Sequence, residues 1–295
     1  MSLWKKYHLV HSIREAFQVL SESNGRGRLI AGGTDLLLDL DQGRYPEVDT
    51  LVDISSIPEL SIIEECQDRL FIGAAAPLSR IIASNLVRKH AEALKEACEL
   101  IGGSQVRNVA TLGGNVAHAL PAADGTIALL ALDAKAVVVS LDGERVLELE
   151  ELFYGPGKST IDPIKELILG FSLPLIEPRQ ASIFLRVMRP QGVALPILNL
   201  AVWLLRENDH HNGGIIGDIR IAVGPSGPTP KRARQCEEVL RGNPLNQDSL
   251  DKALSALLEE SHFRNSPHRT SIAYRKHLSE VLFIQGMNLC WHRTF

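Results

Sequence analysis

Cysteine is scarce in this sequence and never clustered. The four cysteines lie far apart along the chain: Cys66, Cys98, Cys236 and Cys290. No pair has C-x-x-C spacing and no C-x4-C-x2-C pattern occurs, so the chain carries neither a zinc motif nor an iron–sulfur motif of its own. We expect four reduced thiols, and any iron–sulfur chemistry must come from another chain.

Long apolar runs are also missing. The longest, from Val193 to Leu205, is too short to span a bilayer and contains Pro196 and Asn199. The N-terminal residues lack the apolar centre and the cleavage site of a signal peptide. We therefore expect no membrane association and a cytoplasmic location.

Charge of one sign is not in excess. The 31 basic and 35 acidic side chains give a formal net charge of −4, which argues against a large positive surface for nucleic acid. The chain offers no convincing Ser/His/Asp set, paired carboxylates or metal-binding cluster. We therefore assign no catalytic and no metal-binding residue, and we expect any redox chemistry to belong to a cofactor.

Glycine, by contrast, is concentrated in two stretches beside apolar segments. The first, LIAGGTDLLLDL, covers residues 29–40, and the second, GGSQVRNVATLGGNVAHALPAADG, covers residues 102–125. Neither fits G-x-G-x-x-G or the P-loop. Glycine pairs after a strand can still expose successive backbone N–H groups that bind anions, so the two turns could face opposite sides of one pyrophosphate. The same pairs also serve as turns or close-packing devices, and the residues alone leave both interpretations open.

Hydrophobic periodicity predicts a mixed chain of helices and strands. Helical spacing marks residues 86–101 as one helix, and Thr34 is the expected cap of a shorter one. Asp142-Gly143 predicts a hairpin turn. The Pro-rich stretch 173–181 marks the expected domain boundary, and the strands and helices beyond it predict a small antiparallel sheet backed by helices.

At these residues the sequence resembles a known family. Both glycine stretches are similar to the flavin-binding segments of the FAD-binding medium subunit of molybdenum hydroxylases, of the xanthine dehydrogenase and carbon monoxide dehydrogenase type. LFYGPGKSTIDPIKELILGFSLP resembles the segment that closes the family's FAD domain, and HRTSIAYRKHLSEVL resembles its C-terminal helix. The resemblance covers nearly the whole chain.

The resemblance implies a fold, namely an α+β protein. A two-subdomain FAD-binding unit of the PCMH or vanillyl-alcohol-oxidase-like kind would cover residues 1–176, with subdomains of about 1–57 and 58–176. A small α+β domain like the C-terminal domain of carbon monoxide dehydrogenase flavoprotein, with an antiparallel sheet and helices, would cover residues 177–295.

The resemblance also implies a role in electron transfer. Substrate is hydroxylated at a molybdenum cofactor in a large subunit, and electrons pass through iron–sulfur clusters of a small subunit to FAD in this chain. FAD would then reduce NAD, oxygen or a carrier protein. Neither the substrate, nor the acceptor, nor the stoichiometry of the assembly follows from the sequence.

Site residues follow by motif position. Residues 31–36 would line the FAD pyrophosphate, with Thr34 among the donors, and the second stretch would lie along the pyrophosphate and ribityl chain. Asp124 would bind a sugar hydroxyl or anchor its loop. His118 and Arg186 depart from the family, which often has a small or polar residue and a lysine there, with consequences that the sequence leaves open. The full set of expected cofactor-binding residues is Leu29, Ile30, Ala31, Gly32, Gly33, Thr34, Asp35, Leu36, Thr111, Gly113, Gly114, Asn115, His118, Asp124, Ile168, Leu169 and Arg186.

Two alternatives remain at this stage. A stand-alone flavin oxidase of the same fold would need a substrate pocket with catalytic Tyr, His or Arg residues. The sequence of the C-terminal half does not indicate such a pocket. A non-catalytic assembly or interaction protein would have kept the fold and lost the flavin. The intact glycine pairs, Asn115 and Asp124 argue against such loss.

Overall fold

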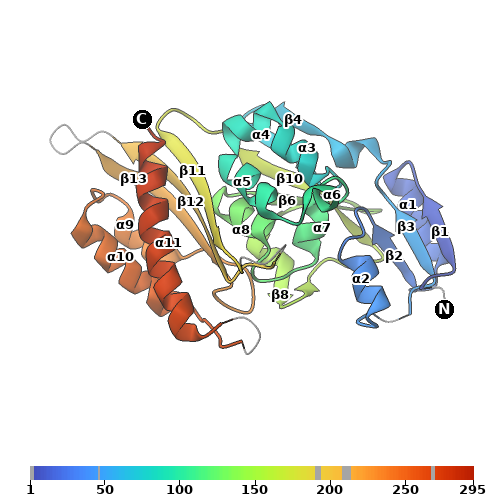
Figure 1. Ribbon diagram of the computed structural model, residues 1–295. Coiled ribbons are helices and arrows are strands. Elements are labelled where there is room, and N and C mark those ends of the chain that lie inside the picture. Colours follow the sequence, from blue (N-terminus) through green and yellow to red (C-terminus); the bar gives the residue numbers. More distant parts are fainter. Residues whose placement is uncertain (1–2, 46, 190–193, 208–213, 267–269) are drawn as a thin grey trace.

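The computed structural model of the chain describes residues 3–45, 47–189, 194–207, 214–266 and 270–295. The elements form three consecutive units, each built on its own main sheet (Figure 1). The first unit, in blue, and the third, in yellow to red, lie at opposite ends of the molecule with the second between them. None of the helices in the described ranges combines the length and apolar character that crossing a bilayer requires.

The first unit is a three-stranded parallel sheet in the order β1-β3-β2. Its elements are β1 (Lys6–Leu9), α1 (Ile13–Glu22), β2 (Gly27–Ile30), α2 (Leu36–Asp41) and β3 (Thr50–Asp53). Parallel neighbours need crossover connections, and the helices lie in those connections. Since β2 ends at Ile30, the first glycine stretch leaves the sheet at the carboxyl end of that strand.

The second unit is a five-stranded antiparallel sheet in the order β4-β5-β10-β6-β7. Its strands are β4 (Ile63–Cys66), β5 (Arg69–Gly73), β6 (Lys135–Ser140), β7 (Gly143–Glu148) and β10 (Glu166–Pro174). Its helices are α3 (Leu78–Ala83), α4 (Asn85–His90), α5 (Glu92–Leu100), α6 (Ser104–Arg107), α7 (Leu112–Ala117) and α8 (Asp124–Ala131). The short elements are η1 (Pro58–Ser61), η2 (Leu149–Leu152), β8 (Phe153–Gly155) and β9 (Lys158–Ser159). Every residue of α8 is buried, so this helix forms the centre of the core.

The third unit is the antiparallel sheet β11-β12-β13 with three helices. Its elements are β11 (Gln180–Val187), β12 (Leu198–Glu207), β13 (Ile215–Gly224), α9 (Arg234–Leu240), α10 (Gln247–Glu260) and α11 (Ile272–His292). Successive side chains of a strand point to opposite faces. Ala201 and Trp203 of β12 therefore pack on the second unit, while Leu200 and Val202 pack in the third unit's own core. This sheet is thus covered on both faces, and it joins the second and third units.

The predicted α+β fold is confirmed, with local corrections. The helix expected over residues 86–101 is two helices, because the chain breaks at Ala91, where φ is −144° and ψ is 49°. Thr34 does not cap α2; Asp35 occupies that position without a side-chain hydrogen bond. The predicted hairpin at Asp142-Gly143 is present as β6 and β7. The domain limits near residues 57 and 176 stay predictions.

Glu96 of α5 connects the second unit to two elements of the third. Its carboxylate accepts hydrogen bonds from the Phe184 backbone N–H at 2.8 Å and from the Arg293 guanidinium at 2.6 Å. Arg293 also donates to the Ser182 carbonyl at 2.9 Å. One side chain of α5 therefore holds β11 and the end of α11.

We predict that Glu96→Ala lowers the free energy of unfolding by about 1–3 kcal/mol, because it leaves the Phe184 N–H without its acceptor. Glu99→Ala is the matched control, since Glu99 is exposed and its ion pair is with Lys95 of the same helix, at 3.3 Å. The control should change stability by no more than about 0.5 kcal/mol. Urea unfolding of both variants tests this, and equal losses would contradict the connecting role of Glu96.

Candidate functional site: a cleft where the three units meet

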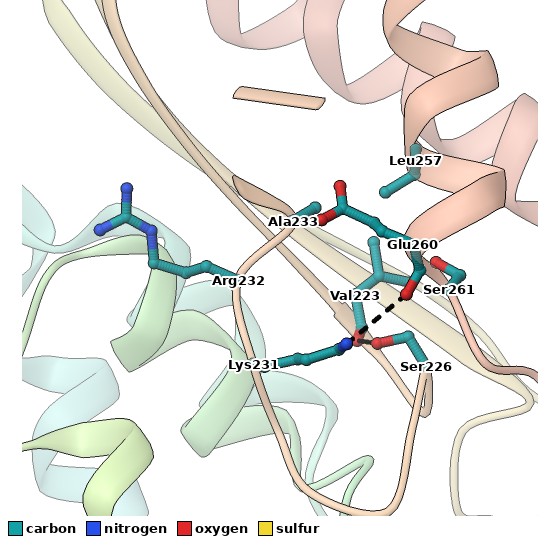
Figure 2. A pocket seen from close by; sticks show the side chains of 8 residues that line it. All are labelled: Val223, Ser226, Lys231, Arg232, Ala233, Leu257, Glu260 and Ser261. Atoms are coloured by element: carbon teal, nitrogen blue, oxygen red, sulfur yellow. Dashed lines mark hydrogen bonds between the residues drawn. The ribbon is translucent and has the colours of Figure 1, made fainter. Parts of the chain in front are cut away.

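A large cleft opens where the glycine stretches and the third unit come together. Its volume is about 1190 Å³, above the range of about 300–1,000 Å³ that is typical of drug-sized ligands and therefore suited to a dinucleotide. A second hollow, beside Ser226 and Lys231, measures only about 10 Å³, roughly the space for one water molecule (Figure 2). The cleft is therefore the candidate site.

The first glycine loop supplies unbonded N–H groups to the cleft wall. The backbone N–H groups of Gly32, Gly33 and Thr34 donate no hydrogen bond to any described residue. Gly33 has φ of +67°, which L side chains rarely adopt. Successive free N–H groups in a turn bind anions, so this loop has the chemistry that a pyrophosphate needs.

The second glycine loop differs from the first in how its N–H groups are used. The Gly113 N–H donates to the Ala74 carbonyl at 2.8 Å, and the Gly114 N–H donates to the Thr111 hydroxyl at 3.1 Å. Both glycines lie inside α7, and a Cβ on Gly113 would stand 2.6 Å from Ala74. The N–H groups of these two glycines are therefore used for close packing and helix capping, and the expected place of this loop beside a pyrophosphate stays a prediction.

Asn115 nevertheless provides a polar group that lacks a partner. It lines the cleft, and its side-chain Oδ1 is buried without a hydrogen bond to any described residue. A buried polar atom without a partner costs about 1–3 kcal/mol, which a ligand hydroxyl or N–H group in the cleft would offset. The residues of the wall therefore fit a polar dinucleotide.

His118 lies at the carboxyl end of α7 and faces α2 of the first unit. Its Nδ1 is 3.9 Å from Oδ2 of Asp39, a buried carboxylate that also accepts from Arg44 at 2.7 Å. His118 and Asp39 both line the cleft. Position 118 thus places an imidazole beside an acidic partner at the junction of the first two units.

Asp124, the first residue of α8, forms a buried ion pair with Arg186 of β11. Asn199 of β12 donates to the same carboxylate at 2.6 Å and to the Ala122 carbonyl at 3.2 Å. Burial raises the pKa of Asp124 from 3.8 to about 6, against the opposing effects of Arg186 and Asn199. Of the two roles expected for Asp124, the contacts match the anchor of its loop.

The cleft brings together nearly all of the expected residues. Ile168 lines it, whereas Leu169, the next residue of β10, packs in the core between the first and second units. Glu166 and Leu167 also line the cleft, and the pairing of β10 with β6 shifts its register between Ile168 and Gly170, so Leu169 lies where the strand is irregular. The expected residues that do line the cleft are Leu29, Ile30, Ala31, Gly32, Gly33, Thr34, Asp35, Leu36, Thr111, Gly113, Gly114, Asn115, His118, Asp124, Ile168 and Arg186.

Several cleft residues were not found from the sequence. Arg28 and Tyr45 of the first unit line the wall, with the guanidinium 5.9 Å from the ring centre. His262, Arg264 and the buried Arg275 line it from the third unit. Of these five residues, only Arg275 lies in a segment that the sequence analysis singled out, HRTSIAYRKHLSEVL, which resembles the family's C-terminal helix.

Comparison with known proteins identifies the family of the chain. Residues 3–176 match a family profile described as the FAD binding domain in molybdopterin dehydrogenase, and residues 183–289 match one described as the CO dehydrogenase flavoprotein C-terminal domain. The chain is 30% identical over 281 residues to the xanthine dehydrogenase FAD-binding subunit of Escherichia coli O157:H7, covering 94% of this chain and 92% of that protein.

Two further relatives span the same length. The glyceraldehyde dehydrogenase medium chain of Sulfolobus acidocaldarius is 31% identical over 282 residues, covering 95% of this chain and 96% of that one. A solved structure of carbon monoxide dehydrogenase from Hydrogenophaga pseudoflava superposes with a TM-score of 0.90 at 26% identity, covering 98% of both chains.

The fold and the cleft define a flavoprotein subunit of an oxidoreductase, with FAD as its cofactor. Within that class, the chain belongs to the family of FAD-binding medium subunits of the molybdenum hydroxylases, which includes xanthine dehydrogenase and carbon monoxide dehydrogenase.

The raised pKa of Asp124 gives a testable pH dependence. The folded state binds the proton of this carboxyl more tightly than the unfolded state does. Its contribution to stability is therefore complete below the ordinary pKa of 3.8 and is lost as the pH rises through about 6. We predict that the stability of the wild type relative to Asp124→Asn falls by up to about 3 kcal/mol from pH 4 to pH 7. Urea unfolding across this pH range measures it, and a difference that rises with pH would contradict the prediction.

Proposed function

We propose that this chain carries electrons through FAD bound in the cleft, from iron–sulfur clusters of a small partner subunit to an acceptor. The substrate would be oxidised at the molybdenum cofactor of a large partner subunit. The observation that carries the proposal is the first glycine loop, whose three successive N–H groups are unbonded within the described chain and whose residues line a dinucleotide-sized cleft. When bound, FAD supplies the redox chemistry that the chain's own side chains lack.

In this proposal each wall of the cleft has its own task. Gly32, Gly33 and Thr34 bind the pyrophosphate through backbone N–H groups. Asn115 offers its Oδ1 to a hydroxyl or N–H group of the cofactor, and the apolar Ile168 packs against a ring. We expect the remaining predicted residues of the cleft wall to contact FAD by packing against it. We propose the domain limits 1–176 and 177–295 for the two parts.

The names of the relatives support the proposal that this chain works with partner subunits. They include a dehydrogenase complex subunit alpha and medium chains or subunits of several dehydrogenases and a hydroxylase, names that imply further chains. The proposal places the molybdenum and iron–sulfur centres in those chains; the described residues of this chain hold no group of His, Cys, Asp or Glu that could bind a metal ion. In this proposal the electron acceptor is NAD, oxygen or a carrier protein. Arg186 keeps a positive charge at a position where the family often has lysine.

Gly33→Val is predicted to abolish FAD retention. Gly33 combines a φ of +67° with a position in the cleft wall, and a Cβ there would stand 2.9 Å from Ile30. Gly43→Val is the matched control, because Gly43 has φ of +66°, no atom within 4 Å of a Cβ and no place in the cleft wall. Both variants carry similar backbone strain, and they differ in their place relative to the cleft and in the contact with Ile30.

The measurement is the FAD content of the purified variants and their dissociation constants from flavin fluorescence. The expected result is an affinity at least about a hundredfold weaker for Gly33→Val, equivalent to about 2.7 kcal/mol, with the Gly43→Val affinity close to that of the wild type. A Gly33→Val chain that keeps stoichiometric FAD would sink the assignment of the loop.

A further inference from the structure

Three residues of the third unit form a row across its sheet. Arg186, Asn199 and Gly224 are direct neighbours on β11, β12 and β13. Arg186 and Asn199 both reach Asp124 at the start of α8. Gly224 leaves the necessary space, because a Cβ there would stand 2.5 Å from Oδ1 of Asn199. The sheet therefore accommodates the fully buried side chain of Asn199, in an otherwise apolar strand, beside the cleft.

The row acts on a segment that has few other attachments. Residues 120–122 line the cleft between α7 and α8. Within the described chain, the Asn199 amide is the only group of another element that donates a hydrogen bond to them, through the Ala122 carbonyl. At the preceding residue, Ala119 has φ of +54° and its carbonyl accepts from the Gly157 N–H at 2.9 Å. Such a segment keeps one conformation only when its surroundings hold it.

From these contacts we propose that Asn199 is a positioning residue, through which the third unit fixes residues 119–124 as a wall of the flavin cleft. Asn199 uses both N–H groups of one amide, one on the Ala122 carbonyl and one on the Asp124 carboxylate. Arg186 holds the other oxygen of that carboxylate and the Leu100 carbonyl. FAD affinity then depends on a residue that is not part of the cleft lining. This inference rests on the proposed placement of FAD in the cleft.

The test compares Asn199→Leu, which keeps the size of the side chain but removes both donors, with the wild-type chain. FAD affinity should weaken about tenfold, the effect of losing one such bond to a charged group. In the flavin-free chain, thermolysin should cut before Leu120 about tenfold faster, because the open form of the segment is more populated. Asn199→Thr keeps one hydroxyl donor and should give intermediate values for both measurements.

Glu237→Gln separates positioning from loss of stability. Glu237 is buried in the same unit and accepts from the Ile221 N–H at 2.8 Å and from Arg232 at 2.7 Å, away from the cleft. It should lower the melting temperature but leave FAD affinity and cleavage before Leu120 within about twofold of the wild type.

Wild-type FAD affinity in Asn199→Leu, or an equal loss of affinity in Glu237→Gln, would overturn the positioning role. The result for Gly33→Val distinguishes a failure of this inference from a failure of the proposed placement of FAD. If Gly33→Val loses FAD and Asn199→Leu does not, only this inference fails. If neither variant changes FAD affinity, the proposed placement of FAD fails with it.

Discussion

The shape of the cleft depends on one close approach of two backbone segments, at Gly32 and Val109, which leaves no room for a side chain. A Cβ on Gly32 would stand 2.1 Å from the carbonyl oxygen of Val109, and since both partners are backbone, neither can rotate away. The contact fixes the loop after β2 against the chain that leads into α7, and so joins the first unit to the second. With its path fixed in this way, the loop keeps N–H groups that no described residue uses, and these are the groups a dinucleotide can bind.

The third unit completes the cleft by a different kind of interaction. Taking Asp124 and Arg186 out of water is costly, and a buried ion pair often contributes little net stability. The value of the pair lies in its geometry, because Asn199 and Arg186 together leave the start of α8 one favourable position. The apolar contacts of Ala201 and Trp203 with the second unit provide the attachment, and the polar row sets the alignment.

The sequence predicted most of the elements and most of the expected residues that line the cleft. Strand, hairpin and glycine signals are local, so they can be recognised without knowing the fold. The use of each N–H group is not local: the Gly113 N–H is taken by Ala74, almost forty positions earlier in the chain, and only the folded chain shows this. Leu169 was assigned with Ile168 because the motif is linear, but in the folded chain Leu169 packs in the core, at a shift in the register between β10 and β6. Asn199 stood out only as a polar residue in an apolar run, and its partners come from distant segments.

The most direct test is an experimental structure of the chain, or of its assembly, with FAD bound. Our account predicts pyrophosphate oxygens within hydrogen-bond distance, about 2.7–3.2 Å, of the backbone nitrogens of Gly32, Gly33 and Thr34, with residues 119–124 lining the opposite side. It also predicts no such bond to the nitrogens of Gly113 and Gly114, which are already used within the chain. FAD bound elsewhere, or held by the α7 glycines with the first loop unengaged, would contradict it.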